Sequence, residues 1–247
     1  MSILLDIPTE IICYPKSDEQ EKARRIKELQ SIGVKNVLLE GRKKIDGHQV
    51  IGKGCVSIAV LADTASGLAI LKMRRMDADR SDMFHEVQML KFANKSSLGP
   101  KLFSYSNNFI IMEYIAGSLI AEWLNNVRTF QLSKVKTVLK DLLAQCYKMD
   151  IMHLDHGELS NASKHVIIRN TDLKPIIIDF ESASRNRQAN NLTSICQFIF
   201  KNKELLDIMK LSHNSITSDD SNKILRNHKK NPTKKCFNQI LRMYKLN

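Results

Sequence analysis

The stretch KPIIIDFES, residues 174–182, decides how this chain should be interpreted. Three consecutive isoleucines after a proline predict a short buried strand, and that strand ends in the acid Asp179. A carboxylate at such a position can cap the next turn, or it can hold a hard cation that substrate phosphates also bind. A polar loop and a partner strand, HVIIRN at residues 165–170, come just before it. We therefore interpret Asp179 as a metal ligand.

The polar loop, HLDHGELSNASK at residues 153–164, contains two histidine–acid pairs only three positions apart. Either Asp155 or Glu158 could act as the general base that accepts a proton from a hydroxyl group. Only one of them is expected to do so, and the sequence leaves the choice open. We prefer Glu158, which is nearer to the hairpin and lies 21 residues before Asp179.

A second metal ligand is expected in the same loop. Asn161 is the first choice, because its amide oxygen is the kind of donor that a hard cation such as Mg²⁺ prefers. His165 stands immediately before the strand but is less suited to magnesium.

In the first half of the chain, IGKGCVSIAV at residues 51–60 has a strand-turn-strand pattern with two glycines. Missing side chains let backbone N–H groups approach a phosphate, although two glycines at a hairpin turn are more often simple turn residues. The phosphate interpretation therefore depends on the rest of the chain. Nucleotide contacts are expected from Ile51, Gly52, Lys53, Gly54, Ser57 and Val60.

Twenty positions after Gly52, an apolar strand running from Ala69 ends in Lys72. A lysine at a strand end is common, but one that follows a glycine loop can reach a phosphate. Glu86, on the predicted helix 79–94, is placed to pair with it, although a solvated surface glutamate is the alternative. Further on, FIIMEYIAG at residues 109–117 is an apolar strand running to a glycine, and it resembles the hinge between the lobes of protein kinases. That resemblance implies an adenine pocket lined by Met112, Glu113, Tyr114 and Ile115.

Together these elements resemble the atypical protein kinases of the RIO and KEOPS-kinase kind, over residues 50 to 200. In this resemblance, Lys72 matches the lysine of the V-A-I-K element, Asp179 matches the aspartate of D-F-G, and His156-Gly157-Glu158 matches the H-G-D of the catalytic loop. The loop and the IIDFESAS segment also look like the predicted serine/threonine kinases of archaea. Glu158 and Glu181 depart from the family pattern, and no A-P-E element follows.

The resemblance implies an α+β, bilobal, protein-kinase-like fold that binds ATP with Mg²⁺ or Mn²⁺. It implies transfer of the γ-phosphate to a serine or threonine hydroxyl, the chain's own included. We expect an N-terminal helical extension at 1–40, a β-rich lobe at 41–116, and a reduced, mostly helical lobe at 117–247. A helix capped by Ser17 or Asp18 should span 17–31, and a loop should span 212–231.

Composition bears on the partners and the location of the protein. The 38 basic and 26 acidic residues give a net charge of +12, with much of the excess after residue 200. This balance is compatible with contact to RNA or a ribonucleoprotein, or with a solvated basic tail. Five scattered cysteines and the lack of a long apolar run predict a cytoplasmic protein that does not enter a membrane.

Two rival functions share most of these features. One is a small-molecule kinase of the aminoglycoside-phosphotransferase type, which would need an acid-rich acceptor pocket. The other is a nucleotide switch, either non-catalytic or an ATPase, that binds RNA or a protein assembly, and it is motivated by Glu158, Glu181 and the displaced asparagine.

Overall fold

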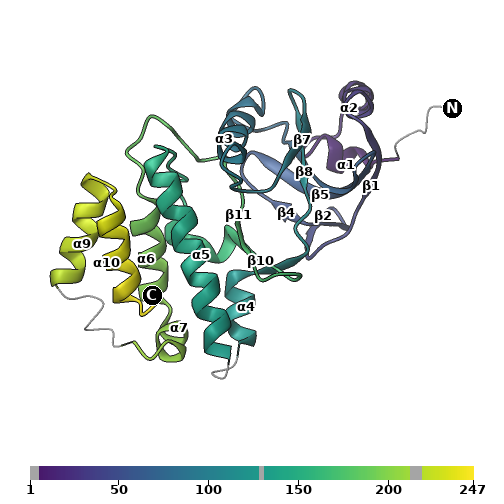
Figure 1. Ribbon diagram of the computed structural model, residues 1–247. Coiled ribbons are helices and arrows are strands. Elements are labelled where there is room, and N and C mark those ends of the chain that lie inside the picture. The colour runs from purple at the N-terminus through teal and green to yellow at the C-terminus, as the bar shows by residue number, and fades with distance from the viewer. Residues whose placement is uncertain (1–5, 128–130, 212–218) are drawn as a thin grey trace. The chain divides into compact units, whose positions relative to one another are not determined.

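The computed structural model describes residues 6–127, 131–211 and 219–247 (Figure 1). The chain divides into two compact units, Met1–Tyr114 and Ile115–Asn247. The first unit is built around a β-sheet and the second consists mainly of helices, which confirms the predicted α+β class. Across the described ranges, no helix is both long enough and apolar enough to cross a membrane.

The first unit contains a six-stranded antiparallel sheet in the order β1-β5-β6-β8-β7, with β4 pairing on β5. A two-stranded hairpin, β2-β3, stands apart from this sheet. The strands are β1 (Val34–Leu38), β2 (Lys43–Ile45), β3 (His48–Val50), β4 (Gly52–Lys53), β5 (Ser57–Thr64), β6 (Gly67–Arg74), β7 (Leu102–Tyr105) and β8 (Phe109–Glu113).

Strands β5 and β6 form the centre of the sheet. They are joined by a tight turn in which Gly67 has φ +91°, and the Thr64 hydroxyl donates to its carbonyl oxygen at 2.8 Å. The pairing of Val60 with Leu71 sets the register, and both side chains are fully buried. Successive side chains of a strand point to opposite faces of the sheet, so this register also fixes the direction of Lys72, which points to the face opposite to that of Leu71.

Three helices accompany this sheet: α1 (Thr9–Ile12), α2 (Glu19–Ser31) and α3 (Phe84–Asn94). The carboxylate of Asp18 accepts a hydrogen bond from the backbone N–H of Glu21, so Asp18 is the cap of α2, one of the two predicted residues. Helix α3 begins at Phe84, five residues later than the sequence suggested, after an Asp82 side chain that accepts from the Phe84 N–H.

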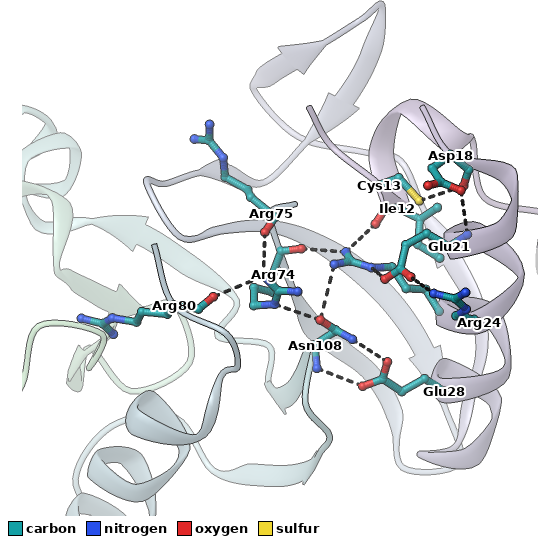
Figure 2. A network of polar contacts seen from close by, with 11 residues as sticks. Ile12, Cys13, Asp18, Glu21, Arg24, Glu28, Arg74, Arg75, Arg80 and Asn108 are labelled. Carbon is teal, nitrogen blue, oxygen red and sulfur yellow. Dashed lines mark hydrogen bonds and ion pairs between the residues drawn. The ribbon is translucent and has the colours of Figure 1, made fainter. Parts of the chain in front are cut away.

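A buried arginine ties α2 to the sheet. Arg25 has no exposed surface, and its guanidinium donates to the backbone oxygens of Ile12 and Arg74, both at 2.7 Å. Asn108 bridges Arg74 and Glu28 in the same network (Figure 2). The N-terminal helices are thus held to the end of β6, two residues beyond Lys72.

The second unit has a small antiparallel sheet in the order β11-β10-β9, and helices that account for most of its length (Figure 1). Its elements are β9 (Gly117–Leu119), α4 (Ile120–Asn126), α5 (Leu132–Ile151), the 3₁₀ helix η2 (Leu159–Lys164), β10 (Val166–Arg169), β11 (Pro175–Ile177), α6 (Asn191–Lys201), α7 (Lys203–Ile208), α9 (Asp219–Lys230) and α10 (Lys234–Met243). The predicted hairpin of β10 and β11 is confirmed.

The strand that the sequence predicted from Phe109 ends at Glu113, before Gly117, and Gly117 begins the next strand, β9, where it pairs with Arg169 of β10. A Cβ atom at Gly117 would overlap the carbonyl oxygen of Ile168, so only glycine permits this close approach of the two strands.

The predicted loop at 212–231 is wrong for residues 219–230, which form helix α9, while residues 212–218 lie outside the described residues. Ser221, Leu225 and His228 are buried at helical spacing on one face of α9. The ring of His228 lies 3.0 Å from the Asp150 carboxylate on α5. A buried polar stripe, rather than an apolar one, makes this helix difficult to recognise from sequence.

Candidate active site

Lys72 and Glu86 form an ion pair inside the first unit. Lys72 lies on β6 opposite Ala59 and Ile110, and its Nζ is 2.5 Å from Oε1 of Glu86, in the first turn of α3. The side chains are 12 % and 3 % exposed. A charged pair this far from water is rigidly placed, because either partner alone would be costly to bury. The sequence analysis predicted this pairing.

The glycine-containing turn is part of the same sheet. Gly52 and Lys53 pair with β5, and the N–H of Gly54 donates to the carbonyl oxygen of Ser57 at 2.8 Å. Ser57 is buried, whereas Ile51 and Gly54 are exposed.

Two residues that the sequence analysis missed hold this turn. Arg75 donates to the Gly54 carbonyl oxygen at 2.8 Å, and its guanidinium lies 5.1 Å from the centre of the Tyr14 ring. The ammonium group of Lys53 lies 4.6 Å from the same ring. Tyr14 therefore lies against two cations that flank the turn, a contact of the cation–π kind. Its position 40 residues before Gly54 gave no signal in the sequence.

The residues expected around adenine occupy neighbouring positions in the sheet. Val60 and Ala69 are fully buried, and Met112 pairs with Ile70. Glu113 accepts a hydrogen bond from the Lys101 N–H, while Tyr114 remains 38 % exposed at the end of the first unit. Ile115 opens the second unit and is buried.

In the second unit, Asp155 is held by structural contacts. Its carboxylate accepts from Arg187 Nε at 2.9 Å and from the Asn190 N–H at 3.3 Å. Its backbone forms an isolated antiparallel bridge with Ser184. The side chain is 12 % exposed, so Asp155 has the contacts of a loop-fixing residue.

Glu158 has a different environment. Its side chain is 43 % exposed, its Oε2 lies 3.1 Å from Nε2 of His165, and its Oε1 accepts from the Ser182 hydroxyl at 2.5 Å. The preceding Gly157 has φ +89°, and a Cβ there would meet the Arg187 guanidinium at 2.7 Å. Glycine at this position therefore lets the loop pass close to Arg187 on its way to Glu158.

Asp179 lies just beyond β11 with φ +69°, a left-handed conformation that aspartate tolerates better than most residues. Its Oδ2 is 3.8 Å from Nδ1 of His165. The carbonyl oxygen of His165 accepts from the N–H of Ile178, so the hairpin backbone fixes the two residues side by side.

Asn161, the first choice for the second metal ligand, is exposed, and its amide oxygen accepts from the Ser163 hydroxyl at 2.7 Å. His165, ranked below it, is the residue whose ring faces the Asp179 carboxylate. Histidine was ranked lower only because of magnesium's preference for oxygen, and nothing in the spacing of the loop showed which side chain would turn inward.

His156 contacts the backbone at the end of the same hairpin. It is completely buried, its Nε2 lies 3.0 Å from the Ile178 carbonyl oxygen, and its ring packs against Phe180 at 5.2 Å between centres. Burial is the main cause that lowers the pKa of His156 from 6.5 to about 4, so the ring is neutral at pH 7. A neutral imidazole with Nε2 protonated can donate to Ile178 and hold the backbone before Asp179.

Comparison with known proteins identifies the fold of the chain. No protein-family model and no curated protein match the chain. Among solved structures, a crystal structure of Rad53 residues 1–466 in complex with AMP-PNP matches with a TM-score of 0.56 and 15 % identity. The match covers 89 % of this chain and 64 % of that one. The chain has a protein-kinase-like fold, as the sequence motifs predicted.

Proposed function

We propose that this chain is an ATP-dependent phosphotransferase that moves the γ-phosphoryl group to a serine or threonine hydroxyl of a protein. The observation that carries the proposal is the ion pair between Lys72 and Glu86 in a kinase-like fold. Phosphoryl transfer depends mainly on positioning and charge stabilisation, and a lysine held rigidly by a buried acid supplies both at a phosphate. The specificity for a protein hydroxyl rests on the family resemblance.

In this proposal the residues of the first unit bind the nucleotide. Lys72 contacts the phosphates, Glu86 fixes its ammonium group, and the turn at Gly52 and Gly54 covers the phosphates with backbone N–H groups. Arg75 and Tyr14 hold that turn in shape. Val60, Ala69 and Met112 supply the apolar surface that an adenine ring would contact.

In this proposal the residues of the second unit act on the hydroxyl that receives the phosphate and on the metal ion. We assign the hydroxyl proton to Glu158 because its side chain is 43 % exposed, although His165 and Ser182 contact its two oxygens. Asp155, 12 % exposed and paired with Arg187, keeps a loop-fixing role. His156 holds the backbone on which Asp179 is placed.

The donors beside Asp179 fit a divalent cation. Its half-exposed carboxylate faces Nδ1 of His165, a buried nitrogen that has no hydrogen-bond partner. Such an ion would neutralise charge on the transferred phosphate. Carboxylates supported by substrate phosphates are sufficient to hold Mg²⁺ in enzymes of this kind.

The proposal is tested by incubating the chain with γ-labelled ATP and Mg²⁺ or Mn²⁺, with and without a generic protein substrate. Wild type should label protein, and Lys72→Met should lower the rate by about 100-fold or more, because one charge at the phosphates is lost. Lys95→Met, an exposed lysine just beyond α3, serves as the matched control and should keep the full rate. Equal rates in all three proteins would contradict the role of Lys72.

A second candidate, an RNA-binding switch, has one observation in its favour. Residues 221–247 contain no acid, and all eight of their basic side chains are exposed: Lys223, Arg226, Lys229, Lys230, Lys234, Lys235, Arg242 and Lys245. A surface groove of about 550 Å³ runs along α9 beside several of them. RNA binding that falls steeply with salt and persists in Lys72→Met, without any phosphate transfer, would favour this candidate.

A further inference from the structure

A histidine near the end of α9 is enclosed by the second unit and reaches the end of α5. The His228 side chain is 1 % exposed, and its Nε2 lies 3.0 Å from Oδ2 of Asp150, which is 2 % exposed. A carboxylate only accepts hydrogen bonds, so Nε2 is the nitrogen that carries the ring hydrogen. The contact joins residues 78 positions apart and ties α9 to α5.

Asp150 accepts four hydrogen bonds, two on each oxygen. Oδ1 accepts from the backbone N–H and the side-chain amide of Asn191, both at 2.8 Å. Oδ2 accepts from the Leu192 N–H at 3.0 Å and from His228. A carboxylate offers about four lone-pair sites, so all of them are used. The donors other than His228 belong to the first two residues of α6, and a carboxylate at a helix N-terminus is favourable.

Asn191 extends these contacts to the loop before Glu158. Its Nδ2 also donates to the Leu154 carbonyl oxygen at 2.7 Å, and its Oδ1 accepts from the His156 N–H at 2.8 Å. Asn191 is 1 % exposed, so its hydrogen bonds lie away from competing water. The loop backbone is therefore held on both sides of Asp155, close to Glu158.

A second contact from α9 reaches the segment before α6. The Lys229 carbonyl oxygen accepts from the Gln188 side chain at 2.6 Å. Arg187, next to Gln188, donates to the carboxylate of Asp155 at 2.9 Å. Two successive residues of α9, His228 and Lys229, are therefore attached to the loop through different neighbours.

We propose that His228 is a positioning residue for the loop that carries Glu158, and that it acts through Asp150 and Asn191. The inference rests on the proposed function and deepens it, because it makes α9 part of the structure that places the base against the reacting hydroxyl. His228 itself touches no substrate. Small displacements of a catalytic group lower the rate by large factors, so a loop held by buried hydrogen bonds favours the reaction.

The test compares three variants of the full chain with wild type by amide hydrogen exchange. His228→Leu removes the donor to Asp150, whereas His228→Gln keeps an N–H donor near the position of Nε2. Leu225→Ala is the matched control, because it loosens the same buried face of α9 and leaves His228 in place. In His228→Leu, exchange at residues 154–158 should rise roughly tenfold or more. His228→Gln should restore the protection, and Leu225→Ala should keep it despite a lower Tm.

Steady-state kinetics separate a positioning role from a merely structural one. His228→Leu should lower kcat by roughly tenfold or more and leave the KM for ATP within about twofold, because the groups assigned to the nucleotide lie in the first unit. In His228→Gln, kcat should recover. Unchanged exchange at residues 154–158 in His228→Leu, or an equal loss of kcat in His228→Leu and Leu225→Ala, would overturn the proposal.

Wild type provides a measurement that needs no variant. If the buried network opens as one unit, the amides of His156, Asn191 and Leu192 should report the same opening free energy as those of α9. A His156 amide that exchanges far faster than the amides of α9 would contradict the coupling. None of the exchange measurements requires phosphate transfer. A wild type that transfers no phosphate therefore contradicts the proposed function, while the exchange rates still decide whether His228 holds the loop.

Discussion

At the scale of single residues, the candidate site depends on groups whose neighbours restrict them to one state. Glu86 pairs with the Lys72 ammonium, the Glu158 carboxylate lies 3.1 Å from Nε2 of His165, and the Ile178 carbonyl oxygen faces His156. Each is a buried or half-buried polar pair, and the strength of such contacts comes from the cost of leaving either partner alone. One of these groups, His156, has a shifted pKa whose effect on stability can be measured.

The depressed pKa of His156 predicts a loss of stability in acid. In the unfolded chain the ring takes up a proton near pH 6.5, whereas in the folded protein it does so only near pH 4, mainly because it is buried. The unfolded state therefore binds more protons in this window, and stability falls as pH falls from about 6.5 to about 4. The neighbouring charges are Asp179, Glu158 and the His165 ring.

Urea unfolding followed by the fluorescence of Trp123, the single tryptophan, measures this effect in the second unit. His156→Gln replaces the ring N–H with an amide N–H donor and cannot titrate, so its free energy of unfolding should fall less between pH 6.5 and 4.5 than that of wild type, by roughly 1–3 kcal/mol. His153→Asn should behave like wild type. The same acid loss in His156→Gln would show that another group is responsible.

At the scale of elements, Arg25 and Glu28 both link α2 to neighbouring segments, and the adjacent Arg24 and Arg25 make a matched pair. Arg25 is fully buried and donates to two backbone oxygens, whereas Arg24 is 75 % exposed and pairs with Glu21 at the surface (Figure 2). Arg25→Ala should lower the free energy of unfolding by roughly 2–4 kcal/mol, because buried acceptors lose their donor. Arg24→Ala should change it by less than about 1 kcal/mol.

Thermal and urea unfolding by circular dichroism measure both variants. Because the Arg25 contact ends at Arg74, two residues beyond Lys72, Arg25→Ala should also weaken nucleotide binding, whereas Arg24→Ala should not. Similar losses of stability in the two variants would mean that burial of Arg25 contributes little.

The sequence predicted most elements because their signals are local. The cap of α2, the strands around Lys72 and the hairpin ending before Asp179 all follow from side-chain pattern and turn residues. Helix α9 was missed because its buried face includes the polar residues Ser221 and His228, and the contact of His228 with Asp150 joins residues 78 positions apart. The pairing of Lys72 with Glu86 was predicted, but the positions of His165 and Tyr14 depend on contacts between distant segments and left no pattern to detect.

At the scale of the whole molecule, the fold and the local geometry of each unit support one function. The first unit presents a lysine fixed by an acid, and the second presents Asp179 on a hairpin beside His165 and Glu158. In the proposed function, the groups assigned to the nucleotide lie in the first unit and those assigned to the reacting hydroxyl lie in the second.

The most direct measurement is the transfer of labelled γ-phosphate from ATP by wild type, Asp179→Ala and Asp172→Ala, with phosphorylated residues located by mass spectrometry. Asp172 is an exposed acid in the hairpin turn that pairs with Arg169, so it controls for loss of a carboxylate. We expect phosphoserine or phosphothreonine with wild type and Asp172→Ala, and a loss of about 100-fold or more with Asp179→Ala at unchanged folding. Transfer that survives in Asp179→Ala, or its absence from a wild type that binds nucleotide, would contradict it.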